Sequence, residues 1–222
     1  MVGSGMARAY VTTDASGNPT ELGLRLSAAA LSGLPAAPTT GTMYMVALPA
    51  ASQTPFDHLS LDWNPVGHDP LALYGVPHFD CHFYMQSISA QMAITLDDPK
   101  GDNLPPLAML PTGYQTAPNV APARTVPMMG RHWVDPTSPE YQPGGHFSTT
   151  FIYGSYDGHV TFLEPMFTKD QLTPTLNFTA PIKQPQTYEA SVSGRYFPTT
   201  YSLHYDAATS EYVIAMQNMT RH

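Results

Sequence analysis

The residues best suited to chemistry are His78, Asp80 and His82, which occur within Pro77–Tyr84 (PHFDCHFY). They alternate with apolar residues, as in a half-buried β-strand, so the pattern predicts a strand. Because a strand projects alternate side chains to one face, we expect all three polar side chains on the same side. Two imidazoles and a carboxylate in one row can bind a metal ion or relay a proton.

The spacing of the two histidines limits how they can act together. In a straight strand His78 and His82 would stand roughly 13 Å apart, which is too far for both to ligate one ion. Three alternatives remove the conflict: a helical segment, a β-bulge, or one histidine that ligates while the other supports it together with Asp80. We therefore expect a site built from some of these residues rather than one exact ligand set.

Further imidazoles and acids lie between positions 58 and 164, and the chain has nine histidines although only 12% of its residues are charged. A divalent ion in a β scaffold commonly takes two or three imidazoles and a carboxylate, which leaves a position for water or substrate. Zinc is the favoured ion, with copper and iron as alternatives. The predicted metal ligands are His78, His82, His132 and Glu164.

Other residues are predicted to act around this centre. Asp80 would orient a histidine or act as a base, and His68 would shuttle protons. Four aromatic residues are predicted to wall a substrate pocket: Trp63, Tyr84, Trp133 and Tyr153. The alternatives to a metal site are a metal-free histidine/carboxylate network and a purely structural cluster.

Composition excludes some classes of protein. The 222 residues carry a formal net charge of −8 and include only three lysines, so no basic face for nucleic acid is expected. No apolar run approaches the roughly 20 residues that cross a bilayer. The single cysteine, Cys81, excludes an intramolecular disulfide.

The fold class follows from the 23 prolines, the 16 glycines and the short alternating segments. We predict an all-β, mainly antiparallel protein, a barrel or sandwich with long proline-rich loops and one or two short helices. Residues 1–8 are predicted to be a leader and residues 9–222 a single β domain. Its proline-rich loop at about 97–126 is expected to be functional or an arm between subunits. The predicted strands are 9–13, 21–26, 42–48, 58–62, 147–153, 159–164, 188–192, 195–204 and 211–217.

Four segments together resemble a known family. They are 55–70 (with DWNPVGHDP), 77–84, 129–135 (MGRHWVD) and 151–166. The set resembles a bacterial extracytoplasmic family of unassigned function, typified by a Thermus protein that is controlled by a sigma-E/anti-sigma-E system and forms a ring-like homo-oligomer. The resemblance runs from about Tyr10 to Leu172. It implies a β-rich homo-oligomer that is periplasmic or secreted after removal of a signal peptide, but it implies no reaction.

Three functions compete at this point. The first is a metal-dependent enzyme, a hydrolase or lyase, that acts on a small molecule through the histidine/carboxylate site. The second is a non-catalytic oligomeric envelope stress protein that binds a ligand or a metal. The third, a carbohydrate-binding or carbohydrate-processing module, is favoured only by the β fold and the aromatic residues.

Overall fold

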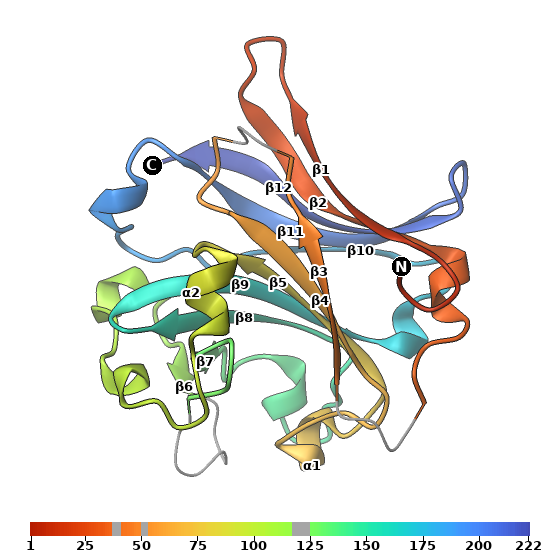
Figure 1. Ribbon diagram of the computed structural model, residues 1–222, viewed down its shortest axis with the longest axis horizontal. Helices are drawn as coiled ribbons and strands as arrows, with labels where there is room; N and C mark the ends of the chain where they lie inside the picture. The colour runs from red at the N-terminus through yellow and green to blue at the C-terminus, as the bar shows by residue number, and fades with distance from the viewer. Residues whose placement is uncertain (37–40, 50–52, 117–124) are drawn as a thin grey trace.

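The computed structural model describes residues 1–36, 41–49, 53–116 and 125–222. Within them, twelve strands form two antiparallel sheets that stack on each other (Figure 1). The predicted all-β, antiparallel fold is confirmed, and it is a sandwich rather than a closed barrel.

The smaller sheet has five strands in the order β1 (Ala7–Thr13), β2 (Pro19–Ser27), β12 (Glu211–Arg221), β11 (Tyr196–Asp206) and β10 (Asn177–Pro181). The larger sheet has seven, in the order β3 (Thr42–Ala47), β4 (His58–Asn64), β5 (His78–Tyr84), β9 (His159–Thr168), β8 (Thr149–Tyr156), β7 (Arg131–Val134) and β6 (Gln115–Thr116). Strand β5 thus lies beside β9, which is far from it in the sequence.

Helices are short in the described part of the chain. The α-helices are α1 (Leu71–Tyr74) and α2 (Ile88–Met92), and neither they nor any other described helix is long and apolar enough to cross a bilayer. The 3-10 helices are η1 (Ala28–Leu31), η2 (Pro99–Asp102), η3 (Leu107–Met109), η4 (Pro139–Tyr141), η5 (Lys169–Gln171) and η6 (Ala190–Val192). The strand predicted at 188–192 is wrong, because this segment bonds to itself as a 3-10 turn, with Val192 donating to the Glu189 carbonyl.

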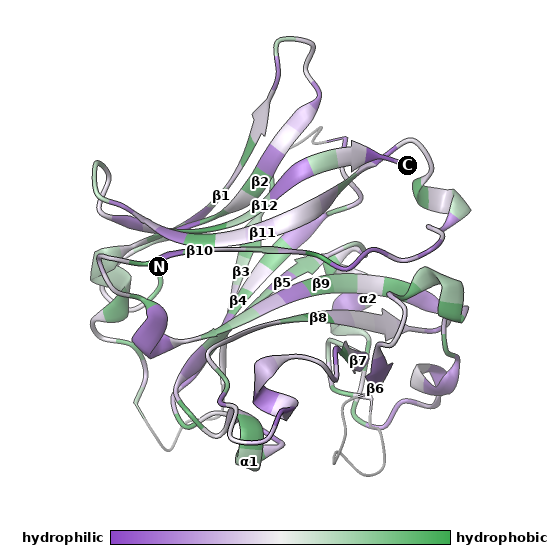
Figure 2. Cartoon of the chain, turned by 180° about the vertical axis from the view of Figure 1, so that it is seen from behind, coloured by the Kyte–Doolittle hydropathy of each residue, from purple (hydrophilic) through white to green (hydrophobic). Residues whose placement is uncertain are grey.

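The main core lies between the two sheets. The long strands contribute alternate residues to it, such as Leu22 and Leu24 from β2 and Phe79, Cys81 and Phe83 from β5, all fully buried. Burying one such side chain stabilises the fold by roughly 1.5–3 kcal/mol. Hydrophobic and hydrophilic residues are correspondingly mixed along the strands of both sheets (Figure 2).

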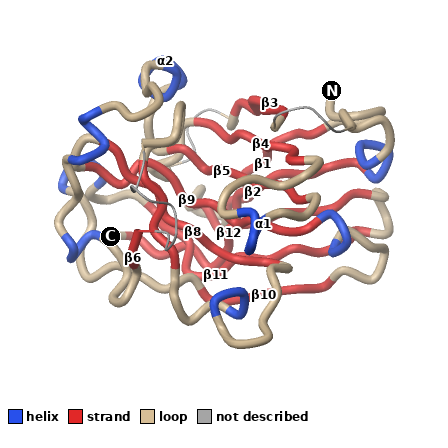
Figure 3. The backbone as a smooth tube through the Cα atoms, turned by 90° about the horizontal axis from the view of Figure 1, so that it is seen from below, coloured by secondary structure: helices blue, strands red, loops and turns tan. Residues whose placement is uncertain are grey.

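The outer face of the seven-stranded sheet is buried as well. Every residue of β4 and β5 is buried, on both faces. The connection that contains α1 crosses this outer face near its middle (Figure 3). Polar side chains on the outer face of β4 and β5 are therefore shielded from bulk water, and this shielding is what makes the site described below unusual.

The proline-rich segment is folded where it is described. It contains η2, η3 and β6, and its Lys100 and Asn103 carbonyls accept hydrogen bonds from Asp157 and Gly158 at the β8–β9 turn. Residues 117–124 of the predicted loop lie outside the described residues. Its role as an arm between subunits stays a prediction.

The first residues of the chain pack against the rest. Val2 is buried in the main core, and the Ser4 amide donates to the Ser32 carbonyl at 2.7 Å. The division into a leader and a single domain stays a prediction.

Candidate metal centre

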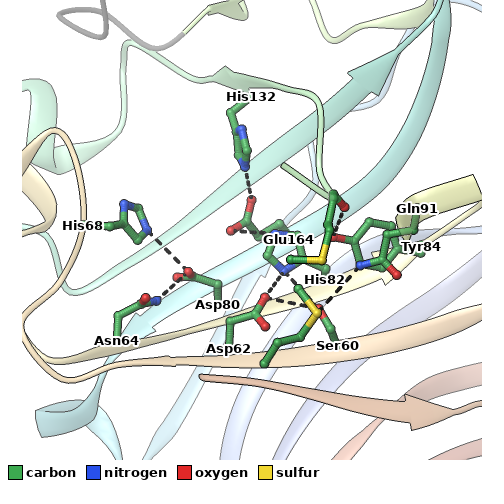
Figure 4. A network of polar contacts seen from close by, with 12 residues as sticks. Ser60, Asp62, Asn64, His68, Asp80, His82, Tyr84, Gln91, His132 and Glu164 are labelled. Atoms are coloured by element: carbon green, nitrogen blue, oxygen red, sulfur yellow. Dashed lines mark hydrogen bonds and ion pairs between the residues drawn. The ribbon is translucent and has the colours of Figure 1, made fainter. Parts of the chain in front are cut away.

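A row of buried polar side chains lies on the outer face of the seven-stranded sheet. Strand β5 contributes His78, Asp80 and His82, each at most 3% exposed. Asp62 of β4 is the cross-strand partner of Asp80, and Glu164 of β9 lies on the other side of β5. Because His78 and His82 are four residues apart along β5, the row separates into two clusters. Figure 4 shows His82 and His132 beside Glu164, and His68 beside Asp80.

The first cluster consists of His82, His132 and Glu164. The Nε2 atom of His82 lies 3.3 Å from Glu164 Oε1, and Nε2 of His132 lies 3.7 Å from Glu164 Oε2. Bonds of about 2.0–2.2 Å to a tetrahedral ion place neighbouring ligand atoms about 3.3–3.6 Å apart. The three side chains are thus positioned where they can hold a metal ion.

Asp62 fixes the orientation of His82. Its Oδ2 atom accepts a hydrogen bond from His82 Nδ1 at 2.9 Å, and the Ser60 hydroxyl donates to the same oxygen. When Nδ1 alone carries a proton, as in a metal-bound histidine, the lone pair of Nε2 is directed toward Glu164. This carboxylate–histidine pairing is the arrangement that orients histidine ligands in metalloproteins.

Two ligand atoms of this cluster have no hydrogen-bond partner. They are His82 Nε2 and Glu164 Oε2, and both are buried. Leaving a buried polar atom unsatisfied costs free energy, and most such atoms in folded proteins are paired. A cation between the ring nitrogens and the carboxylate would satisfy both atoms at once.

The second cluster consists of His68, His78 and Asp80. Nε2 of His68 and Nε2 of His78 lie 3.3 and 3.2 Å from the Asp80 carboxylate. Both histidines donate from Nδ1 to a backbone carbonyl, that of Asp69 and that of Val76. Asn64 donates to Asp80 Oδ2 at 2.8 Å. This cluster can also hold a metal ion by its geometry.

Burial and charge set the protonation of both clusters. Burial alone lowers the pKa of His82, but the Glu164 and Asp62 carboxylates raise it to about 9. Burial raises the pKa of Glu164 to about 8. Burial and the charge of His82 lower the pKa of His132 to about 3. The pKa of His68 is raised to about 9 because Asp80 outweighs the effect of burial. In the absence of a metal ion, the protons on His82 and His68 therefore supply the positive charge that balances the buried carboxylates.

A cavity of about 460 Å³ opens beside both clusters. Its polar lining residues are Asp62, Asn64, His68, Asp69, Asp80, Thr116, Arg131, His132 and Glu164. Its apolar lining includes Met43, Met128, Met129 and Tyr74. The volume is within the range of small-molecule sites, so the clusters face a space that can take water and a ligand.

The structure separates the four predicted metal ligands. His82, His132 and Glu164 are brought together, whereas His78 joins His68 and Asp80, the two residues predicted to act on protons. The conflict in the spacing of His78 and His82 is thus resolved without a helix or a bulge in β5, because each histidine belongs to a different cluster.

The structure places the four aromatic residues of the predicted substrate pocket away from the cavity beside the clusters. Trp63, Trp133 and Tyr153 belong to the core between the sheets, because their positions in β4, β7 and β8 alternate with the residues that face the cavity. Tyr84 lies on the outer face but is fully buried and stacks on His82, with ring centres 5.4 Å apart. None of the four lines the cavity beside the clusters.

Sequence reasoning misses Ser60, Asp62 and Asn64 as site residues. The signal is present in β4 (HLSLDWN), which has the same alternation of polar and apolar residues as β5. His58 begins this row, but it bonds to Asp57 at Nδ1 and to Gln91 at Nε2, so it has no free ring nitrogen for a metal.

Fold and site together define a β-sandwich protein with a buried histidine/carboxylate centre on the outer face of its larger sheet. The family described as "TTHB210-like: Hypothetical protein TTHB210" has a model that matches residues 14–63. The chain is similar to this hypothetical family over β2 to β4, which include Ser60 and Asp62. The match supports the family resemblance seen in the sequence, but it carries no information on localisation or assembly. No curated protein and no solved structure matches the chain.

Proposed function

We propose that His82, His132 and Glu164 bind a divalent metal ion, with zinc favoured, and that the protein is a metal-dependent enzyme acting on a small molecule. The observation that carries the proposal is the convergence of His82 Nε2 and Glu164 Oε2, both buried and without a hydrogen-bond partner, with His132 Nε2 at the wall of a cavity. The reaction class is hydrolysis or elimination.

Three protein ligands leave a coordination position open for water or substrate. A zinc ion in such a site supplies Lewis acidity and lowers the pKa of a bound water to about 7. His132 is the most accessible ligand, with 19% of its side chain exposed, whereas His82 and Glu164 are buried behind it. The open position would therefore face the cavity.

His68 and Asp80 are placed to move protons beside this ion. The His68 side chain is 39% exposed and lines the same cavity, and its Nε2 lies 3.3 Å from Asp80. Because Asp80 keeps His68 protonated near neutral pH, His68 would act as the acid that protonates a leaving group. Asp80 would hold and orient it.

The metal content of the untagged protein tests the proposal. The protein is incubated with Zn²⁺, dialysed and analysed by elemental mass spectrometry. We expect one tightly held zinc per chain, or two if His68, His78 and Asp80 bind a second ion. Glu164→Gln should weaken zinc binding at least tenfold, since removing even a supporting carboxylate costs about 10–100-fold.

His159→Gln is the matched control for Glu164→Gln. His159 also pairs with a glutamate, Glu189, at 2.9 Å, but it is exposed and outside both clusters. Its zinc content should equal that of the unsubstituted protein. The absence of stoichiometric metal, together with an unchanged melting temperature after addition of a chelator, would overturn the proposal.

Catalysis needs a separate test. Zinc-loaded protein is screened against ester, amide, lactone and phosphoester substrates, and His68→Gln is compared with the unsubstituted protein on any substrate that is turned over. We expect His68→Gln to retain the zinc held by His82, His132 and Glu164 and to lose about 10²–10⁴-fold in kcat, the usual contribution of a general acid. Full activity of His68→Gln would remove this residue from the mechanism.

A non-catalytic envelope protein, periplasmic or secreted and oligomeric, is the second candidate. Large apolar side chains are exposed along one segment of the chain: Ile88, Met92, Leu96, Leu104 and Leu107. Such residues on a surface can mark an interface, so this segment would pack against another copy.

Leu107→Asp tests this second candidate, because Leu107 is 75% exposed. Light scattering should show a smaller assembly for Leu107→Asp. The control, Leu71→Asp, substitutes a leucine that is 63% exposed but lies outside the segment. A monomer for all three proteins would eliminate the oligomer.

A further inference from the structure

A second cavity, of about 620 Å³, lies between the two sheets and so on the opposite face of the seven-stranded sheet from the metal centre. Tyr153 and Leu163 line it from β8 and β9, and Phe197 lines it from β11 of the other sheet. It lies at the end of the sandwich where the β8–β9 turn faces the start of β11 (Figure 1). Its volume is in the range of sites that enclose small organic molecules.

The lining of this cavity is mostly apolar, but two of its residues carry a buried polar atom without a hydrogen-bond partner. Thr161 Oγ1 and Gln86 Nε2 are buried without a hydrogen-bond partner, and Thr161 as a residue is only 5% exposed. By contrast, the Gln184 amide, which also lines the cavity, donates to Ile182 and accepts from Tyr188. Both residues line the cavity, so a side-chain rotation that brings either atom to the cavity wall would let it donate to an acceptor group of a ligand.

A β-bulge directs Thr161 toward the cavity. Ser155 pairs with Val160 and Gly154 pairs with Phe162, so Thr161 is the extra residue on β9. A bulge redirects a side chain relative to regular alternation, and bulges are frequent beside functional sites. Val160 and Thr161, neighbours in sequence, consequently both line the cavity.

The charged residues at the rim of this cavity disfavour an anionic ligand. Asp98, Asp157 and Glu189 line the rim. The rim cation Lys100 is 3.2 Å from Asp157, and His159 is 2.9 Å from Glu189, so each faces an acid already. A carboxylate at this rim would meet an excess of negative charge.

We propose that this cavity binds an uncharged, mostly apolar small molecule whose carbonyl or comparable acceptor accepts hydrogen bonds from Thr161 and Gln86. The apolar body would lie against Tyr153, Leu163 and Phe197. The site is separate from the proposed metal centre and needs no metal ion.

The uncharged fluorescent probe N-phenyl-1-naphthylamine tests for the site. Its fluorescence should rise saturably with one site per chain, and 2-decanone should displace it at least tenfold better than decanoate does. A chelator should leave the titration unchanged, because the metal centre is on the other face of the sheet. Failure of the metal proposal would therefore leave this result standing.

Two variants locate the binding. Thr161→Val keeps the shape of the side chain and removes its hydroxyl, so 2-decanone should bind about fivefold more weakly, the usual effect of one hydrogen bond. Thr168→Val, on the same strand but outside the cavity, is the control and should bind normally. Met109→Trp places an indole at a lining position on η3 and should abolish probe binding.

Melting curves verify that each variant is folded. Probe binding that is absent from the unsubstituted protein, or unchanged in folded Met109→Trp, would overturn the cavity as a binding site. Stronger displacement by decanoate than by 2-decanone, or an unchanged 2-decanone affinity in Thr161→Val, would overturn the ligand class.

Discussion

At the scale of single residues, the notable feature is that the ring nitrogens of the clusters are oriented by other groups. Nδ1 of His82 is held by a carboxylate, and Nδ1 of His68 and of His78 by backbone carbonyls. In each case Nε2 is directed at a buried carboxylate. A purely structural histidine needs hydrogen bonds at both nitrogens, as His58 has. His82 has a hydrogen bond at only one.

Asp62→Asn tests the orientation of His82. The amide keeps the shape of the carboxylate, but it removes the charge and can donate to Nδ1, which favours the wrong tautomer. We expect zinc affinity to fall about 10–100-fold, measured by competition with a fluorescent chelator. Asp57→Asn, at the exposed partner of His58, is the control and should bind zinc normally. Equal affinities for both variants would show that Asp62 does not support a ligand.

Zinc binding should also depend on pH. In the metal-free protein the Glu164 carboxylate raises the pKa of His82 against the effect of burial, and burial raises the pKa of Glu164, so the pair holds at least one proton at pH 7. A metal ion requires their deprotonated forms, so binding must release protons. Affinity should rise with pH between 6 and 8, by about tenfold per pH unit for each proton released. Calorimetry in buffers of different ionisation enthalpy counts these protons, and a count of zero would contradict the cluster as a ligand set.

At the scale of elements, the alternation in β5 allows the sequence to predict which face carries His78, Asp80 and His82. It does not allow the partners to be predicted, because they come from neighbours in the sheet. Glu164 contacts His82 only because β9 pairs with β5, although the two strands are far apart in the sequence. Nothing in a single sequence shows that order of strands, and for the same reason the sequence cannot show that Trp133 and Tyr153 lie on the face of the sheet opposite the clusters.

Gly154→Ala tests the coupling between β8 and the site. A Cβ atom at Gly154 would stand 2.0 Å from the Phe162 ring, which packs against both His82 and His132. We expect a loss of about 1–3 kcal/mol in the free energy of unfolding, as for other overpacked sites, and weaker zinc binding. Urea denaturation measures the first effect.

The double variant Gly154→Ala/Phe162→Leu is the control for this mechanism. A smaller side chain at position 162 gives the added methyl group room, so part of the lost stability should return. If the double variant is less stable by the sum of the two single effects, the contact with Phe162 is not the cause.

At the scale of the whole molecule, the sandwich has two cavities on opposite faces of one sheet. Composition and short alternating segments are sufficient to predict an antiparallel β protein. They cannot decide between a sandwich and a barrel, because closure depends on whether edge strands such as β3 and β6 pair with each other. The seven-stranded sheet is covered on both faces, so it can enclose polar chemistry on one side and an apolar cavity on the other.

Anomalous scattering at the zinc absorption edge, from crystals of the zinc-incubated protein, tests the central claim most directly. We predict a peak about 2.0–2.2 Å from His82 Nε2, His132 Nε2 and a carboxylate oxygen of Glu164. Density without anomalous signal at this position, with water molecules bonded to His82 Nε2 and Glu164 Oε2, would contradict it.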